Sequence, residues 1–216
     1  MNTQKIRMPL DISMTVLSII LMGGTILFPD DRVHQILGMA LFALWICHSI
    51  LNRRWFSSIF RGKFPSFRVL QITVNLCLLF CALLLFVSGM MMASFLPLDV
   101  GGALGFARTA HLVSSHWYYV FMCAHLGLHA SMIFSRILKG RKMPLVPKIV
   151  IAIVAVYGVF AFVVRGIAKY MFLRQEFFFL DLERGILLFA ADYISILVLF
   201  ATIFHFVGKI LTRKKR

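Results

Sequence analysis

Long stretches without Asp, Glu, Lys or Arg constrain this chain more than any other feature. A membrane-spanning helix needs about 20 mostly apolar residues, because it must pair its own backbone polar groups within the lipid. Six stretches reach or approach this length: Ile12–Pro29, Val33–Asn52, Val69–Leu98, Thr109–Ser135, Ile149–Val164 and Tyr193–Gly208. The sequence therefore predicts an all-α integral membrane protein with six transmembrane helices.

The first stretch and the last two need further argument. We expect the fifth helix to continue past Arg165 to about Met171, and the sixth to start near Gly185 with Asp192 inside it. A cleaved signal peptide is the alternative for the first segment. However, Ile12–Phe28 is longer than the usual apolar core of about 7–15 residues, and no small-x-small cleavage site follows it. We expect a retained helix there.

The overall composition excludes soluble classes of protein. Hydrophobic residues make up 61% of the chain and charged residues 14%. Globular domains have roughly 45–50% and about 25%. These values exclude a soluble globular domain, a disordered chain and a disulfide scaffold.

The basic residues are distributed unevenly between the two sides of the predicted helices. Most of the 23 Lys and Arg residues lie before the first helix, between the second and third, between the fourth and fifth, and after the sixth. All of the 8 acidic residues except Asp11 fall toward the other side. By the positive-inside rule, this bias predicts a multi-pass protein of the cell membrane with both termini in the cytoplasm. The net charge of +15 then faces anionic lipid of the bilayer, and no nucleic-acid partner is needed.

Histidines inside the predicted spans carry the functional signal, because ionisable groups are costly there. His34 and His48 lie fourteen positions apart on the second helix, and His111 and His125 lie fourteen apart on the fourth. In an α-helix this spacing returns to the same face, with about 40° of rotation and about 21 Å of axial separation. Both helices run from outside to inside. Each level of the membrane is therefore predicted to hold one histidine from each helix.

Two haem groups fit this arrangement of paired histidines. His34 with His111 would ligate an outer haem, and His48 with His125 an inner one. Imidazole is a common haem ligand, and an iron with two histidines favours electron transfer because it has no open position. A zinc site would need a third or fourth ligand at each level, and the pattern supplies none. The expected cofactors are two haem b groups, with a quinone as a candidate additional ligand.

Small and basic residues near the histidines suit the same interpretation. Small residues at Gly38 and Ser115, and in the pairs Gly23-Gly24 and Ser88-Gly89, would let a porphyrin approach the helices; ordinary helix packing is the alternative. Arginines could pair with haem propionates. They are Arg32 and Arg108 at the outer level and Arg53 with Arg54 at the inner level; topological charge is the alternative.

Three further histidines have less certain roles. His129 lies eighteen positions after His111 and also returns to the ligand face, so it competes with His125 as inner ligand. The equal axial spacing favours His125, and His129 would then lie near a propionate or a quinone. His116 lies off the ligand face and is expected to make a polar contact near the outer surface. His205, near the inner end of the last helix, is expected to pack or to reach the interface.

Residues from about Val33 to Ser131 resemble the flavinylation-associated cytochrome domain, a family of bacterial membrane b-type cytochromes. The resemblance is carried by VHQILGMALFALWICHSILNRRWF, RGKFPSFRVLQITVNLCLLF, VSGMMM and FARTAHLVSSHWYYVFMCAHLGLHA. It implies b haem, a bacterial inner-membrane location and electron transfer to extracytoplasmic flavin-carrying proteins. It marks five histidines as positions of interest: His34, His48, His111, His125 and His129. His116 departs from the family pattern.

The sequence thus predicts two parts. Residues 1–140 would form a four-helix diheme cytochrome b domain, and 141–216 two additional transmembrane helices of unassigned role. Electrons would pass between a quinol or cytoplasmic-side donor and an extracytoplasmic flavoprotein. Two alternatives remain: a self-contained membrane reductase of quinone or ferric chelate, and a haem-free transporter with a histidine proton relay. A transporter would favour broken helices and internal repeats, which the sequence does not indicate.

Overall fold

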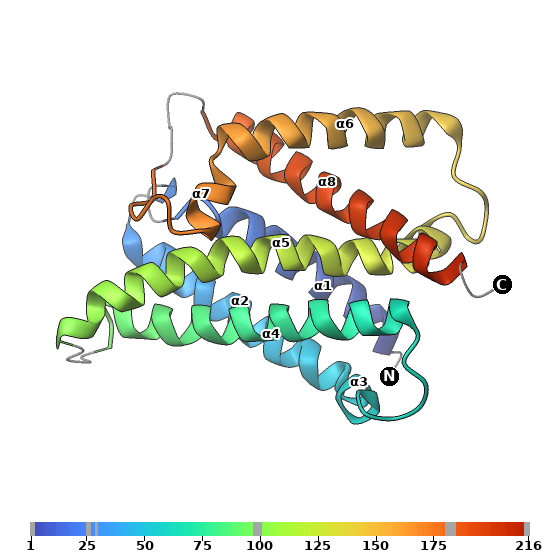
Figure 1. The fold of residues 1–216 in the computed structure, drawn as a ribbon. Coiled ribbons are helices and arrows are strands. Elements are labelled where there is room, and N and C mark those ends of the chain that lie inside the picture. Colours follow the sequence, from blue (N-terminus) through green and yellow to red (C-terminus); the bar gives the residue numbers. More distant parts are fainter. Residues whose placement is uncertain (1–2, 25–26, 29, 97–100, 180–184, 214–216) are drawn as a thin grey trace.

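The computed structural model describes residues 3–24, 27–28, 30–96, 101–179 and 185–213, and they form helices and connections without a β-strand in these ranges. The bundle is elongated, with α4 and α5 side by side along its length (Figure 1). The helices are α1 (Thr3–Leu21), α2 (Asp31–Leu51), α3 (Arg53–Ser58), α4 (Ser66–Met92), η2 (Gly101–Ala103), α5 (Leu104–Ile137), α6 (Leu145–Val164), α7 (Ile167–Met171) and α8 (Gly185–Arg213).

Five segments of the described chain are long and apolar enough to cross a membrane. They are α2, α4, the continuous segment Gly101–Ile137, α6 and α8. The all-helical membrane character is confirmed, whereas the count of six is not. The difference lies in α1, which starts before the predicted stretch Ile12–Pro29 and ends at Leu21. Its first half therefore carries Lys5, Arg7 and Asp11, and only a short apolar segment follows.

The fifth predicted helix does not continue unbroken to Met171. α6 ends at Val164, and Gly166 takes a left-handed conformation with a φ of 64° before α7 begins. A residue without Cβ adopts this conformation without steric cost, which explains the break at Gly166. The short α7 then packs against α5, where the Trp117 indole donates to the Met171 carbonyl at 3.0 Å.

Glycines set the close packing of the second half of the bundle. At Gly127 of α5 an added Cβ would overlap the backbone of Ala201 on α8. At Gly158 of α6 it would overlap the backbone of Ser195, also on α8. Small residues let membrane helices approach to backbone contact, where dispersion forces replace the missing hydrophobic driving force. α8 is thereby held against both α5 and α6.

A buried ion pair joins α6 to α8 within this packing. The Arg165 Nε donates to Asp192 Oδ2 at 2.8 Å, and the Tyr157 hydroxyl donates to Asp192 Oδ1 at 2.6 Å. The side chains of Arg165 and Asp192 are only 6% and 1% exposed. The pairing explains how the last helix carries an acid, as the sequence analysis expected for Asp192. An unpaired charge would be costly at this site.

The basic segments gather at one end of the bundle. The start of α1, the helix α3, the α5–α6 connection and the end of α8 all lie at the right in Figure 1. The turn after α4 and the short α7 lie at the other end. We call these the basic end and the opposite end. This arrangement is the one that the charge distribution predicted.

Gly158→Ala should destabilise the bundle, because the new methyl group has no space against the Ser195 backbone. Overpacking typically costs about 1–3 kcal/mol. Thermal unfolding in detergent should therefore show a lower midpoint than for the unchanged chain. Gly105→Ala is the matched control, because nothing lies within 4 Å of its added Cβ. Equal midpoints for the two variants would contradict the packing argument.

Topology reporters test the orientation. Alkaline phosphatase, which is active only outside the cytoplasm, should be active when fused after Gln175 and inactive after Arg213, because the basic end should face inward. A green fluorescent protein preceding Met1 should fluoresce if α1 also crosses the membrane. A dark N-terminal fusion, with the other two results unchanged, would show that only five helices cross.

Candidate functional site

The histidines at the opposite end lie ring to ring across two helices. His34 follows the start of α2, where the Asp30 carboxylate accepts from the Arg32 backbone N–H and caps the helix. His111 lies in the first turns of α5. The centres of the two imidazole rings are 6.3 Å apart, with their planes at 66°. We call His34 and His111 the outer pair.

A cavity of about 600 Å³ opens beside the outer pair, within the range of roughly 300–1,000 Å³ typical of cofactor pockets. Both histidines line it, and apolar and aromatic side chains supply most of its wall. Gly38 also lines it, and a Cβ there would meet nothing within 4 Å. A Cβ on Gly89 would lie 3.5 Å from His111 Cε1. Small residues therefore leave room beside the rings, as the sequence analysis expected.

The connection between α7 and α8 contributes to this cavity. Glu176, Phe177 and Phe178 line it, and the Phe178 ring lies against Gly24 of the turn after α1. Residues from both predicted parts of the chain, 1–140 and 141–216, therefore build the outer site. The predicted second part of the chain, which had no assigned role, therefore supplies part of the cavity wall.

Hydrogen bonds orient His111 but leave part of His34 without a partner. The Ser88 hydroxyl donates to the Leu84 carbonyl at 2.6 Å, so its oxygen accepts from His111 Nδ1 at 3.1 Å. This leaves Nε2 of His111 without its proton. His34 Nδ1 is buried and finds no hydrogen-bond partner among the described residues.

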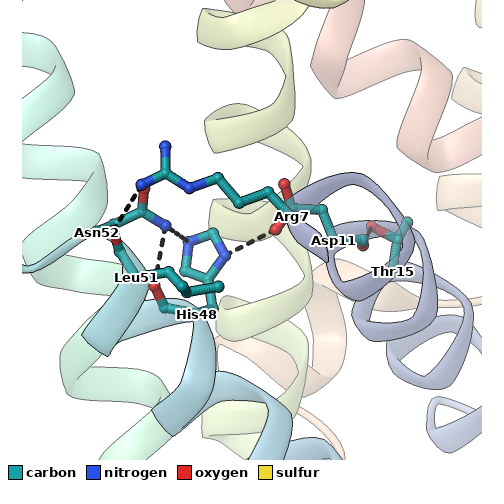
Figure 2. A network of polar contacts seen from close by, with 6 residues as sticks. All are labelled: Arg7, Asp11, Thr15, His48, Leu51 and Asn52. Carbon is teal, nitrogen blue, oxygen red and sulfur yellow. Dashed lines mark hydrogen bonds and ion pairs between the residues drawn. The ribbon is translucent and has the colours of Figure 1, made fainter. Parts of the chain in front are cut away.

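The second pair of histidines lies at the basic end. The ring centres of His48 on α2 and His125 on α5 are 6.4 Å apart, with planes at 75°. His125 Nδ1 donates to the Asn75 side-chain oxygen at 2.8 Å. His48 Nδ1 donates to Asp11 Oδ1 at 2.8 Å, a contact between α1 and α2 that Figure 2 shows. We call His48 and His125 the inner pair.

His129 lies one turn beyond the inner pair on α5. Its ring centre is 4.7 Å from that of His125. The structure thus brings both candidate ligands of α5 close to one level, with the His125 ring at 6.4 Å from His48. Their roles as ligand and neighbour stay predictions.

The predicted arginines differ in their placement. Arg108 lines the outer cavity near its exposed mouth. Arg32 is exposed at the start of α2 and does not line the cavity. Arg53 and Arg54 are exposed in α3, at the basic end. Only Arg108 is therefore placed by the structure beside a pocket that could hold a carboxylate.

His116 makes the expected polar contact beside the outer pair, but it is buried. His116 is only 1% exposed, and its ring stacks on that of Tyr170 with centres 4.6 Å apart. Its Nδ1 donates to the Leu112 carbonyl at 2.8 Å, while Nε2 is buried without a partner, and the residue lines the outer cavity. The burial comes from α7, which the predicted continuous fifth helix could not place. His205 is half-buried on α8, with Nδ1 3.5 Å from the Ser131 hydroxyl oxygen.

The sequence did not predict several hydrogen-bond partners of the paired histidines. Asn75 is one of two amides, with Gln71, within the apolar stretch Val69–Leu98, and Asp11 is the one acid on the basic side, so each was visible in its context. Their pairing with His125 and His48 required the packing of α4 and α1 against α5 and α2. The aromatic residues of the α7–α8 connection gave no signal in the sequence.

The described residues contain no group of three or more His, Cys, Asp or Glu side chains that could hold a metal ion. Each pair could supply two ligands to a group that brings its own remaining ligands, as a porphyrin does. In comparisons with family models, curated proteins and solved structures, nothing matches this chain. The resemblance to the flavinylation-associated cytochrome domain therefore stays a prediction.

Proposed function

We propose that this chain is a six-helix membrane cytochrome that binds two b haems and carries electrons across the bilayer. The donor would be a quinol or another cytoplasmic-side reductant, and the acceptor an extracytoplasmic flavin-carrying protein. The observation that carries the proposal is the recurrence of one geometry: two histidine pairs, each from α2 and α5, with ring centres 6.3 and 6.4 Å apart.

These separations match two imidazoles that share one metal ion. A ligating imidazole nitrogen lies about 2.0–2.1 Å from its metal and the ring centre about 1.1 Å further, which puts two opposed ring centres about 6.3 Å apart. Ordinary edge-to-face packing of rings also spans about 4.5–7 Å, so the support comes from the recurrence of the same pairing at two levels of the same two helices. The match at both pairs supports bis-histidine ligation at each level.

The outer cavity supports the proposal independently. Its volume of about 600 Å³, its mostly apolar wall and the open space at Gly38 suit a flat apolar ligand. Arg108 would pair with a propionate at the mouth, as guanidinium suits carboxylate. His34 and His111 would hold the iron. Ser88 fixes the ring of His111 by accepting from its Nδ1.

At the inner site, His48 and His125 would hold the second iron. Both rings already donate through Nδ1, to Asp11 and Asn75, which restricts their rotation. His48 Nε2 accepts from the Asn52 amide at 3.3 Å and would exchange this contact for the iron. A bound haem supplies reversible one-electron transfer, and two histidines leave its iron no position for substrate.

The course of α1 supports a sixth transmembrane helix. Asp11 contacts His48 at the basic end of α2, and Met22 and Gly24 line the outer cavity with His34. α1 thus accompanies α2 between the two histidine levels, where it would be within the bilayer. Its charged first turns would lie in the basic interface.

The outer partner would meet the mouth of the outer cavity. Asp31, Arg108 and Glu176 are exposed there and line the cavity. The sequence carries no nucleotide-binding or flavin-binding motif, so the partner must supply the flavin. A quinol could deliver electrons at the inner level, where His129 lies close to His125.

The purified chain should contain two haems with a reduced-minus-oxidised spectrum of b type. His48→Ala should remove one haem and His34→Ala the other, because each substitution removes one of the two histidines that would hold that iron. His205→Ala, a histidine of the same bundle outside both pairs, should retain two. A chain without haem would contradict the proposal and favour the proton-relay alternative.

Haem content should also distinguish the two candidate inner ligands on α5, His125 and His129. His125→Ala should behave like His48→Ala, since its ring faces His48 at 6.4 Å. His129→Ala should keep two haems and slow reduction by quinol. Loss of a haem from His129→Ala but not from His125→Ala would reverse the ligand assignment while leaving the diheme function intact.

A further inference from the structure

The two histidine pairs differ in what accepts their Nδ1 protons. In the inner pair, His48 donates to a carboxylate and His125 to an amide oxygen. In the outer pair, His111 donates to a hydroxyl, and His34 Nδ1 meets no carboxylate or other acceptor within the described part of the chain. The same ligand type is thus placed in two different electronic environments.

Asp11 contacts the inner pair from a third helix. It lies on α1, whereas the paired histidines lie on α2 and α5, and its carboxylate accepts from His48 Nδ1 at 2.8 Å (Figure 2). Arg7, one turn earlier on α1, donates through Nη2 to the Leu51 carbonyl at 2.7 Å. Its guanidinium therefore ties α1 to the end of α2.

An anionic acceptor at Nδ1 changes the ligand as well as its orientation. The carboxylate draws the Nδ1 proton toward itself and makes Nε2 a stronger electron donor. A stronger donor stabilises ferric over ferrous iron and lowers the reduction potential, since hydrogen bonding around a haem ligand tunes its potential. A hydroxyl that already donates elsewhere has a weaker effect, and a missing partner has none.

We propose, resting on the function above, that Asp11 is a positioning residue that makes the inner centre the more reducing of the two. Electrons then run downhill from the basic end to the opposite end. The transfer moves one electron from the iron at the inner pair to the iron at the outer pair; the first is oxidised, the second is reduced, and no bond forms or breaks.

The external reactants complete the electron balance. A membrane hydroquinone gives two electrons and two protons at the inner side and becomes a quinone. A flavin of the outer partner accepts the two electrons, with protons from the outer solution. This direction would release protons on one side of the membrane and consume them on the other.

Two neighbouring features act against the effect of Asp11. The Asn52 amide nitrogen lies 3.3 Å from His48 Nε2 and would weaken the electron donation of that nitrogen. It also donates to the His48 carbonyl at 2.9 Å, so it keeps a hydrogen-bond partner when Nε2 binds a metal. The positive charges of Arg7, Arg53 and Arg54 would favour the ferrous state. Arg53 and Arg54 are exposed, so solvent and salt weaken their effect. The Asp11 side chain is also 48% exposed, but it acts on His48 through a direct hydrogen bond.

Potentiometric titration of the purified two-haem protein in detergent tests the inference. The titration follows the haem absorbance, and the inner haem is identified as the signal that His48→Ala removes. In the unchanged chain, the inner haem should have the lower potential. Asp11→Asn keeps the size of the side chain but removes the charge. It should shift the inner reduction equilibrium at least tenfold toward ferrous, about 59 mV for one electron, and leave the outer potential in place.

Two further variants separate an electronic role from a structural one. Asp11→Glu, which keeps the carboxylate, should restore most of the low potential. Ser88→Ala, which removes the acceptor of His111, should move the outer potential and not the inner one. If Asp11→Asn releases the inner haem, the order of the two potentials in the unchanged chain still decides, because an inner haem with the higher potential overturns the inference.

The outcomes distinguish this inference from the function on which it rests. An inner haem with the higher potential, or one whose potential does not respond to Asp11→Asn, would overturn the inference and leave the diheme function standing. An unchanged chain that binds no haem would overturn both.

Discussion

The parallel course of α2 and α5 is the constraint on which the rest of the structure depends. Both helices begin at the opposite end of the bundle and end at the basic end. Equal spacing of histidines on two neighbouring helices yields two facing pairs, and the parallel course decides which residues meet: His34 faces His111, and His48 faces His125. Parallel neighbours need intervening segments, and α3 and α4 provide the return path. The long α4 packs extensively on α5 and carries Ser88 and Asn75 to the two levels.

The second half of the chain holds this arrangement in place. α8 contacts α5 at backbone distance beside Gly127, and α6 contacts α8 beside Gly158. The buried Asp192, paired with Arg165 and Tyr157, fixes the register of α6 against α8. α5 is therefore packed from two sides, by α4 and by α8, which restricts its rotation and so the direction of His111 and His125. A ligand pair needs such support, because a small rotation of one helix would separate the rings.

Much of this fold follows from periodicity and charge, and the exceptions have local causes. The spans of α2, α4, α5 and α8 and the facing histidines follow from apolar length and from helical geometry. α1 differs from its predicted range because the helix already includes Lys5, Arg7 and Asp11, whereas hydropathy alone places its start after these charged residues. The break at Gly166 and the burial of His116 under Tyr170 depend on one left-handed residue. Asp11, Asn75 and Phe178 reach the sites through tertiary packing, which spacing along a single helix does not describe.

The cover over the outer cavity has a consequence for assembly. Phe177 and Phe178 line this cavity, yet they are made long after both of its histidines. At about 5–20 residues per second, the segment from His111 to Phe177 takes about 3–13 s to synthesise. During that interval the cavity wall that these two rings supply does not exist, and the space beside His34 and His111 is open on that side. A flat ligand could enter sideways while the ribosome is still translating, and the later packing of Phe178 against Gly24 would narrow the route behind it.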